Sequence, residues 1–88
     1  MTGHKGSRPV VILRFLTALS NGPMLKTHVM YSALSNSADT TWYLDILERG
    51  GMVTRETGVY KIQYALTEKG RAFLAKLVEL EKEFPEVW

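Results

Sequence analysis

The chain has 88 residues, of which 45% are hydrophobic and 23% are charged, a composition typical of a folded globular domain. This length supports one domain with a modest core, and domains of this size often draw part of their stability from oligomerisation. The sequence contains no cysteine, which excludes disulfides, zinc–cysteine sites and thiol catalysis. No apolar run approaches the ~20 residues that cross a bilayer and no secretory signal is recognised, so we expect an intracellular protein.

The net charge of +2 is distributed unevenly along the chain. Residues 1–36 carry four basic residues and no acidic residue. Residues 37–66 carry three basic and four acidic residues, and residues 67–88 carry four basic and five acidic residues. A basic first third is compatible with a polyanionic partner, and equally with an ordinary solvated surface.

The first third of the chain predicts two helices. Apolar residues recur at helical spacing over about 9–19 and cover nearly the whole circumference, so this helix must be covered on more than one side. The segment 20–23 ends it, and a short extended piece at 24–25 follows. A second helix is expected over about 26–34, with a buried side made of Val29, Met30, Ala33 and Leu34.

A polar segment at 35–37 predicts a tight turn and a cap, from Asn36 or Ser37, for a third helix over about 37–49. Gly50 and Gly51 end this helix. Two helices joined by a short polar turn are typical of a helix-turn-helix. The residues expected on the buried side of the third helix are Thr40, Tyr43, Leu44 and Leu47. The tyrosines expected in the core or at its edge are Tyr31, Tyr43, Tyr60 and Tyr64.

The hydrophobic period then changes to alternation, which predicts a β-hairpin. Its strands are expected over 52–55 and 59–66, joined by a loop at 56–58. A last helix is predicted from its cap at Thr67 to about Phe84. This order of elements is that of a mainly helical α+β fold, the winged helix-turn-helix.

Four segments carry a resemblance to a known family: ILRFLTAL at 12–19, THVMY at 27–31, YLDILERGGMV at 43–53 and YALTEKG at 64–70. Together they resemble archaeal winged-helix regulators and the related small dimeric archaeal chromatin proteins, and more distantly the PadR and MarR types. The resemblance covers roughly residues 10–80. It implies that the third helix enters a major groove of double-stranded DNA, that the hairpin contacts backbone or minor groove, and that the last helix pairs with its twin.

The exposed face of the third helix departs from that pattern. It carries no lysine or arginine before Arg49, so the common arginine–guanine contact is unavailable from most of the helix, and its aspartates would repel phosphate. The residues expected on this face are Ser37, Ala38, Asp39, Thr41, Trp42 and Asp45. An acidic and aromatic helix also suits a protein partner. A second hypothesis is therefore a winged-helix module for protein–protein interaction without DNA binding.

Several residues have polar or aromatic side chains that can contact DNA. These DNA-contact candidates are Lys26, Thr27, Ser37, Thr41, Trp42, Arg55 and Lys61. The hydroxyls of the third helix can bond phosphate or base edges, and the tryptophan can pack on a thymine methyl or a sugar. Lys26 and Thr27 begin the second helix, whose free backbone amides can hold a phosphate. Arg55 and Lys61 lie on the hairpin and can straddle a minor groove. Lys5 and Arg8 can add diffuse electrostatic contact. Each candidate also has an ordinary structural interpretation: Ser37 as a cap, Trp42 as a residue that packs on the hairpin or on a partner, and the others as a helix start or solvated residues.

The last helix carries the strongest signal for an interaction. A heptad-like seam, which a monomer covers only in part, consists of Phe73, Leu77, Leu80 and Phe84. We therefore expect a homodimer with three regions: a flexible basic arm at 1–8, a winged helix-turn-helix domain at 9–66, and a dimerisation helix with a short tail at 67–88.

The sequence offers no arrangement that indicates an enzyme, since paired carboxylates, a nucleophile with a base, and a phosphate loop are all missing from it. The two histidines, His4 and His28, cannot build a metal site at the usual spacings. We expect no cofactor and no small-molecule substrate. The predicted function is double-stranded DNA binding, as a transcriptional regulator or a nucleoid-associated protein of the cytoplasm.

Overall fold

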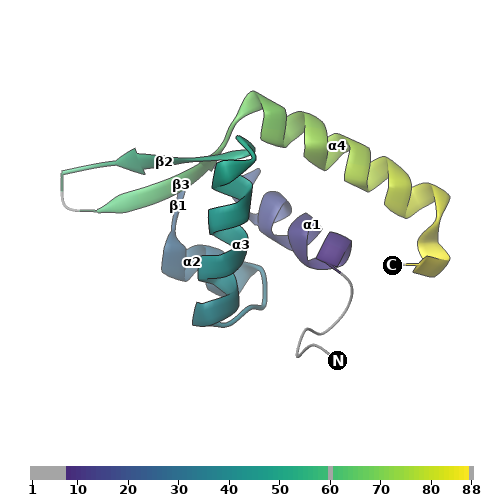
Figure 1. Ribbon diagram of the computed structural model, residues 1–88, viewed down its shortest axis with the longest axis horizontal. Helices are drawn as coiled ribbons and strands as arrows, with labels where there is room; N and C mark the ends of the chain where they lie inside the picture. Colours follow the sequence, from purple (N-terminus) through teal and green to yellow (C-terminus); the bar gives the residue numbers. More distant parts are fainter. Residues whose placement is uncertain (1–7, 60, 88) are drawn as a thin grey trace.

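The computed structural model describes residues 8–59 and 61–87. Its elements are, in chain order, α1 (Arg8–Leu19), β1 (Met24–Leu25), α2 (Lys26–Ser32), α3 (Ser37–Arg49), β2 (Val53–Thr57), β3 (Ile62–Leu66), α4 (Glu68–Glu83) and the 3-10 turn η1 (Pro85–Val87). The β2–β3 hairpin, here called the wing, projects from one side of the helices α1 to α3, and α4 extends in the other direction (Figure 1). The expected order of elements is confirmed. Of the arm expected at residues 1–8, residues 1–7 lie outside the described residues, and Arg8 is the first residue of α1 instead.

One antiparallel sheet holds the three strands together, with β3 between β1 and β2. Met24 of β1 lies opposite Tyr64, and Val53 of β2 lies opposite Leu66. The two-residue strand β1 therefore ties the start of α2 to the root of the wing.

The strands of the wing differ from the prediction at their outer ends, since β2 is longer and β3 is shorter than expected. The ladder continues to a pair between Thr57 and Ile62, and the N–H of Gly58 donates to the Lys61 carbonyl at 2.7 Å. Strand β2 therefore ends at Thr57 and β3 begins at Ile62, rather than at the predicted residues 55 and 59. The outer part of β2 is exposed on both of its faces, so its polar residues give no alternation that would mark the end of the strand.

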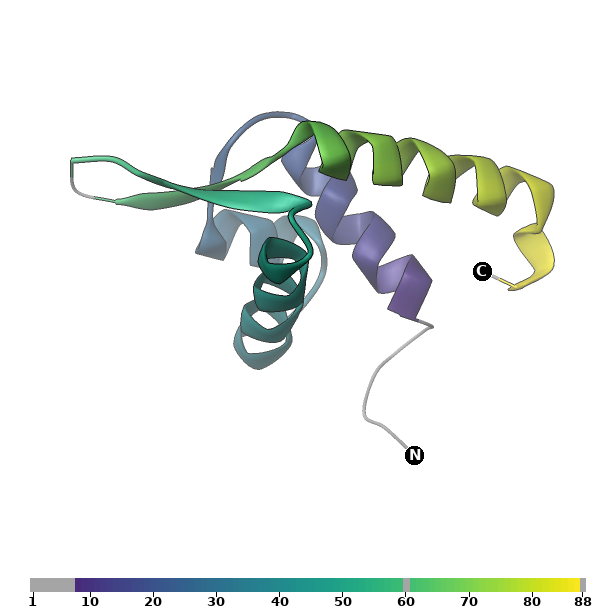
Figure 2. The ribbon, with the colours of Figure 1, turned by 45° about the horizontal axis from the view of Figure 1, so that its top comes forward.

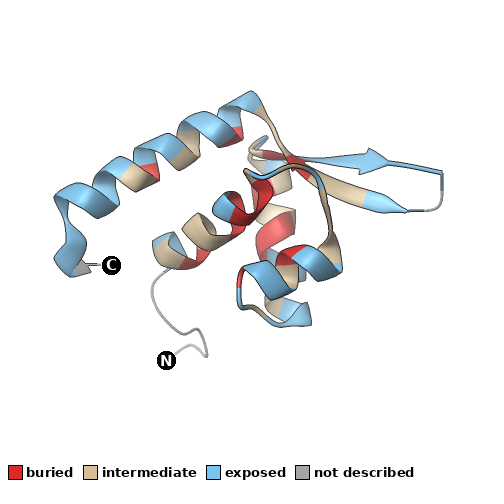
Figure 3. Cartoon of the chain, turned by 180° about the vertical axis from the view of Figure 1, so that it is seen from behind, coloured by how far each residue is buried: buried red, intermediate tan, exposed pale blue. Residues whose placement is uncertain are grey.

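The core lies where α1, α2, α3 and the first turns of α4 meet (Figure 3). Phe15 of α1 stacks on Tyr43 of α3 with ring centroids 5.3 Å apart. Burial raises the pKa of the Tyr43 hydroxyl above its ordinary value, so the phenol is neutral. As predicted, α1 is covered on more than one side, since α2, β3 and α4 all contact it. The largest fully buried side chains are Tyr43, Phe15, Leu16, Leu19, Leu44, Leu47, Val29, Val53 and Thr40.

The end of α2 differs from the prediction. The helix stops at Ser32, and Leu34, expected in the core, is 81% exposed. Leu34 has a left-handed φ of 56°, and the N–H of Ser35 donates to the Met30 carbonyl at 2.9 Å, as in a Schellman motif. The left-handed residue leaves the helical path, so its side chain does not follow the buried face.

Two tyrosines besides Tyr43 can be compared with the prediction, and Tyr60 lies outside the described residues. Tyr64 is half-buried and packs against the core, as expected. Tyr31 is 69% exposed, which contradicts the prediction. It lies two residues after the buried Val29, about 200° around the helix, and therefore faces away from the core.

Side-chain caps fix the starts of α3 and α4. The Asn36 side chain accepts a hydrogen bond from the Asp39 N–H at 2.7 Å, so Asn36, one of the two caps considered, begins α3. Thr67 caps α4 by accepting from the Gly70 N–H at 3.0 Å, and its hydroxyl donates to the Gly51 carbonyl at 2.6 Å. These contacts hold α4 against the root of the wing. Among the described residues, no helix combines the length and apolar character needed to cross a bilayer.

Candidate functional site

A shallow groove of about 470 Å³ lies between the exposed face of α3 and the wing. The candidates Thr41, Trp42 and Arg55 come together in it. The full lining consists of Ala38, Thr41, Trp42, Asp45, Glu48, Arg55 and Tyr64. It is therefore a surface built jointly by a helix and a hairpin, and we describe its polar contacts in turn.

Lys26 joins this surface through Thr41. The Lys26 ammonium, at the start of α2, donates to the Thr41 hydroxyl, and that hydroxyl donates to the Ser37 carbonyl at 3.0 Å. The contact brings a lysine from α2 against the first turns of α3. The exposed Ser37 thus lies one turn before Thr41, on the same helix.

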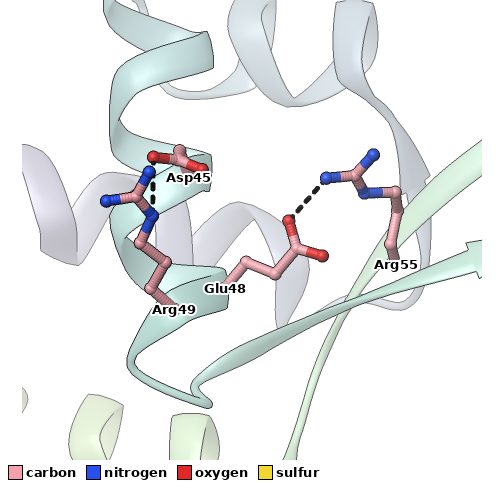
Figure 4. A network of polar contacts seen from close by, with 4 residues as sticks. All are labelled: Asp45, Glu48, Arg49 and Arg55. Atoms are coloured by element: carbon pink, nitrogen blue, oxygen red, sulfur yellow. Dashed lines mark hydrogen bonds and ion pairs between the residues drawn. The ribbon is translucent and has the colours of Figure 1, made fainter.

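Arg55 reaches from β2 toward α3 and pairs with Glu48 (Figure 4). Arg55 Nη2 lies 2.9 Å from Glu48 Oε1, and its guanidinium carbon lies 5.9 Å from the centre of the Tyr64 ring. The hydrogen bond to Glu48 raises the pKa of Arg55 above its ordinary value. The root of the wing is therefore joined to α3 by a charged arginine whose side chain remains 48% exposed.

A second ion pair lies on α3 itself. Arg49 Nε is 3.2 Å from Asp45 Oδ2, one helical turn away (Figure 4). The sequence alone presented Asp45 as a charge that would repel phosphate. In the structure the Asp45 and Glu48 carboxylates are each paired with an arginine, which reduces that repulsion.

Trp42 is 40% exposed and lies edge-on to Tyr43, with ring centroids 4.9 Å apart and an interplanar angle of 89°. The guanidinium carbon of Arg8 lies 4.9 Å from the centre of the Trp42 ring. Arg8 is the first residue of α1, so this contact joins α1 to the exposed face of α3. The sequence suggested only a diffuse role for Arg8, because no local pattern shows that the start of α1 meets α3.

The remaining DNA-contact candidates do not line the groove. Thr27 is exposed in the first turn of α2, and Lys61 is exposed in the turn of the wing. Lys5 lies outside the described residues. Glu48 and Tyr64, which sequence reasoning did not select, line the groove because β2 and β3 bring the wing beside α3.

The apolar seam predicted on α4 is divided in two. Leu77 is only 6% exposed and Phe73 packs against the core, so the N-terminal half of the seam is used within the monomer. Leu80 and Phe84 are 43% and 50% exposed. In both ribbon views the C-terminal half of α4 extends past α1 (Figures 1 and 2).

A helix-turn-helix made of α2 and α3, followed by a hairpin beside the open face of α3, defines a winged helix-turn-helix domain. The comparison with protein families agrees: a family model described as "Winged helix-turn-helix" matches residues 5–84. The chain belongs to this family.

The similar proteins include archaeal and bacterial ones. The uncharacterized protein MJ0287 of Methanocaldococcus jannaschii is 30% identical over 77 residues, which make up 88% of this chain and 75% of that protein. Sso10a-2, a DNA-binding protein from Sulfolobus solfataricus, has a TM-score of 0.83 and 24% identity, covering 91% of this chain and 83% of that one. A MarR family transcriptional regulator from Silicibacter pomeroyi DSS has a TM-score of 0.76 and 26% identity, covering 85% of this chain and 51% of the regulator. The expected fold and the resemblance are thereby confirmed.

Proposed function

We propose that the protein binds double-stranded DNA as a transcriptional regulator or nucleoid-associated protein, with α3 in a major groove and the wing on the adjacent backbone or minor groove. The observation that carries the proposal is the set of cations around the exposed face of α3. Arg8 from α1, Lys26 from α2 and Arg55 from β2 all meet this face. Other elements therefore supply the positive charge that the outward residues of α3 lack before Arg49.

The chemistry of this face suits contact with the DNA backbone more than direct base recognition. A major groove about 12 Å wide admits a helix, and phosphates border it on both sides. Lysine and arginine contacts to phosphate supply affinity that falls steeply with salt. Arg55 must break its ion pair with Glu48 before it can bind a phosphate, so we expect a moderate affinity for DNA.

We infer that the protein acts as a homodimer through the C-terminal half of α4. The exposed Leu80 and Phe84 form an apolar strip that a second copy can cover. A two-fold dimer would present two α3 helices to one duplex. In this proposal residues 9–66 form the DNA-binding domain and residues 67–88 the dimerisation segment. Such a protein works on DNA in the cytoplasm, without catalysis and without a cofactor.

The groove also supports a second candidate function, docking of a basic protein segment. Asp45 and Glu48 line the groove with two carboxylates, together with the aromatic residues Trp42 and Tyr64. Carboxylates and aromatic rings are partners for lysine and arginine side chains. The experiment that tests DNA binding also decides between the two functions.

The test is a titration of a fluorescent random-sequence duplex at low and moderate salt, with the molecular mass measured on the same sample. We expect binding by a dimer that weakens steeply as salt rises, and its loss in the double variant Arg55→Ala with Lys61→Ala. The control is Arg71→Ala with Lys76→Ala, which removes the same charge from exposed positions on α4 and should retain binding. A folded dimer that binds no duplex at low salt would favour protein docking.

A further inference from the structure

Three arginines lie at the exposed face of α3, and they differ in what holds them. Arg49 is paired with Asp45, and Arg55 with Glu48. Within the described part of the chain, no carboxylate lies in ion-pair distance of Arg8, whose guanidinium is held at the ring of Trp42 instead. Arg8 is therefore the arginine on this face whose charge no described carboxylate balances.

The position of the guanidinium over the Trp42 ring also leaves the hydrogen-bonding groups of Arg8 available. A guanidinium held by an aromatic ring makes the contact through its cationic π-system, and its N–H donors lie at its edge in a fixed fork. Such a fork matches the geometry of a phosphate. Trp42 thus orients a cationic group without occupying its donors, and the Arg8 side chain is exposed to solvent.

Arg8 and Arg55 approach α3 from different sides. In both ribbon views α3 lies between the wing and the first turn of α1, which is drawn in dark purple (Figures 1 and 2). Arg55 belongs to the wing and Arg8 to that first turn. A helix inserted in a major groove has a phosphate row of one strand on each side.

We propose that Arg8, oriented by Trp42, binds a backbone phosphate on the DNA strand opposite to the strand met by Arg55 of the wing. The proposal rests on the DNA-binding function proposed above and adds a residue that fixes how α3 sits in the groove. Trp42 is a positioning residue in this arrangement. Arg8 differs from Arg55 in that no ion pair with a described residue has to break before it binds.

The central test compares Arg8→Ala with Arg14→Ala in duplex titrations at several salt concentrations. Arg14 is the matched control because it belongs to the same helix but lines a separate hollow between α1 and α2, with Thr17, Asn21 and Ser32. We expect Arg8→Ala to weaken binding about tenfold. The slope of log K against log salt should become shallower by about 0.9, the value for one lost phosphate contact. Arg14→Ala should leave both quantities close to those of the wild type.

Two further measurements separate a phosphate contact from other roles. The order of affinities for duplexes of different sequence should be the same in Arg8→Ala as in the wild type, because a phosphate contact carries no base information. Arg8→Lys, which keeps the charge, should restore most of the salt slope. In a Trp88→Phe background Trp42 is the one remaining tryptophan, so its fluorescence should change on Arg8→Ala and on addition of duplex.

The outcomes for the two proposals are distinct. If the wild type binds duplex and Arg8→Ala matches Arg14→Ala in affinity and slope, the Arg8 inference is wrong and the DNA-binding proposal stands. If Arg8→Ala changes the preference at one base pair only, the contact is with a base and the phosphate assignment is wrong. If the wild type binds no duplex, the proposed function itself fails. Because Arg8 is exposed at a helix start, thermal unfolding of Arg8→Ala should match that of the wild type.

Discussion

Gly70→Ala is the substitution whose effect on stability the geometry predicts most sharply. Gly70 is buried in the first turn of α4, and a Cβ atom there would lie 2.0 Å from the Met52 carbonyl oxygen and 3.0 Å from Leu66 Cδ2. Real Cβ atoms essentially never approach closer than 3.0 Å, so α4 and the start of the wing would have to separate by about 1 Å. The same carbonyl accepts a hydrogen bond from the Thr67 N–H at 3.1 Å, which this movement would weaken.

The expected magnitude follows from three terms. Overpacking costs about 1–3 kcal/mol, and weakening the hydrogen bond from the Thr67 N–H to the Met52 carbonyl adds about 1 kcal/mol. Replacing a helical glycine by alanine returns about 1 kcal/mol. We therefore expect the free energy of unfolding to fall by about 2 kcal/mol, with a decrease in Tm of about 10 °C.

Circular dichroism during thermal and urea unfolding, at one fixed protein concentration, measures this effect. Ala72→Gly, at an exposed position two residues further along α4, serves as the control and should cost about 1 kcal/mol through helix propensity alone. A Gly70→Ala protein as stable as the wild type would show that α4 does not pack on the Met52 carbonyl, and the reasoning would be refuted.

Three further predictions concern the groove, the turn after α2 and the two halves of α4. Glu48→Gln should raise duplex affinity about three- to tenfold in an anisotropy titration, because it frees Arg55 and removes a negative charge near phosphate; lower affinity would contradict the wing contact. Leu34→Gly should stabilise the protein by about 0.5–1 kcal/mol in urea, since glycine adopts the left-handed φ of 56° without strain; destabilisation would contradict this. Leu77→Ala should cost about 3 kcal/mol of unfolding free energy. Leu80→Ala should instead reduce the dimer fraction in a mass measurement. If the two substitutions changed stability and dimer fraction equally, the assignment of Leu77 to the monomer core and of Leu80 to the dimer interface would be refuted.

The parts of the fold that depend on burial could be predicted from the sequence. Tyr43, Leu44 and Leu47 are spaced as α3 requires, and each is at most 1% exposed. The errors lie where burial gives no signal. Leu34 occupies a left-handed position that usually selects glycine, and the outer residues of β2 are exposed on both faces.

The candidate site could be predicted in outline and not in its contacts. Thr41, Trp42 and Arg55 were found because the exposed face of α3 and the wing follow from the order of elements. The contacts of Arg8 with Trp42 and of Glu48 with Arg55 join different elements, and they depend on how those elements pack. No local periodicity encodes such packing, so these contacts emerged only from the structure.

The most direct test of the central claim, that the exposed face of α3 and the wing bind DNA, is amide chemical-shift mapping by NMR with an unlabelled duplex. The account predicts that the largest shifts occur at the start of α2, along the exposed side of α3 from Ser37 to Asp45, at Arg55 and at Arg8, with small shifts on α4. Shifts confined to α4, or a spectrum that the duplex leaves unchanged at low salt, would contradict it.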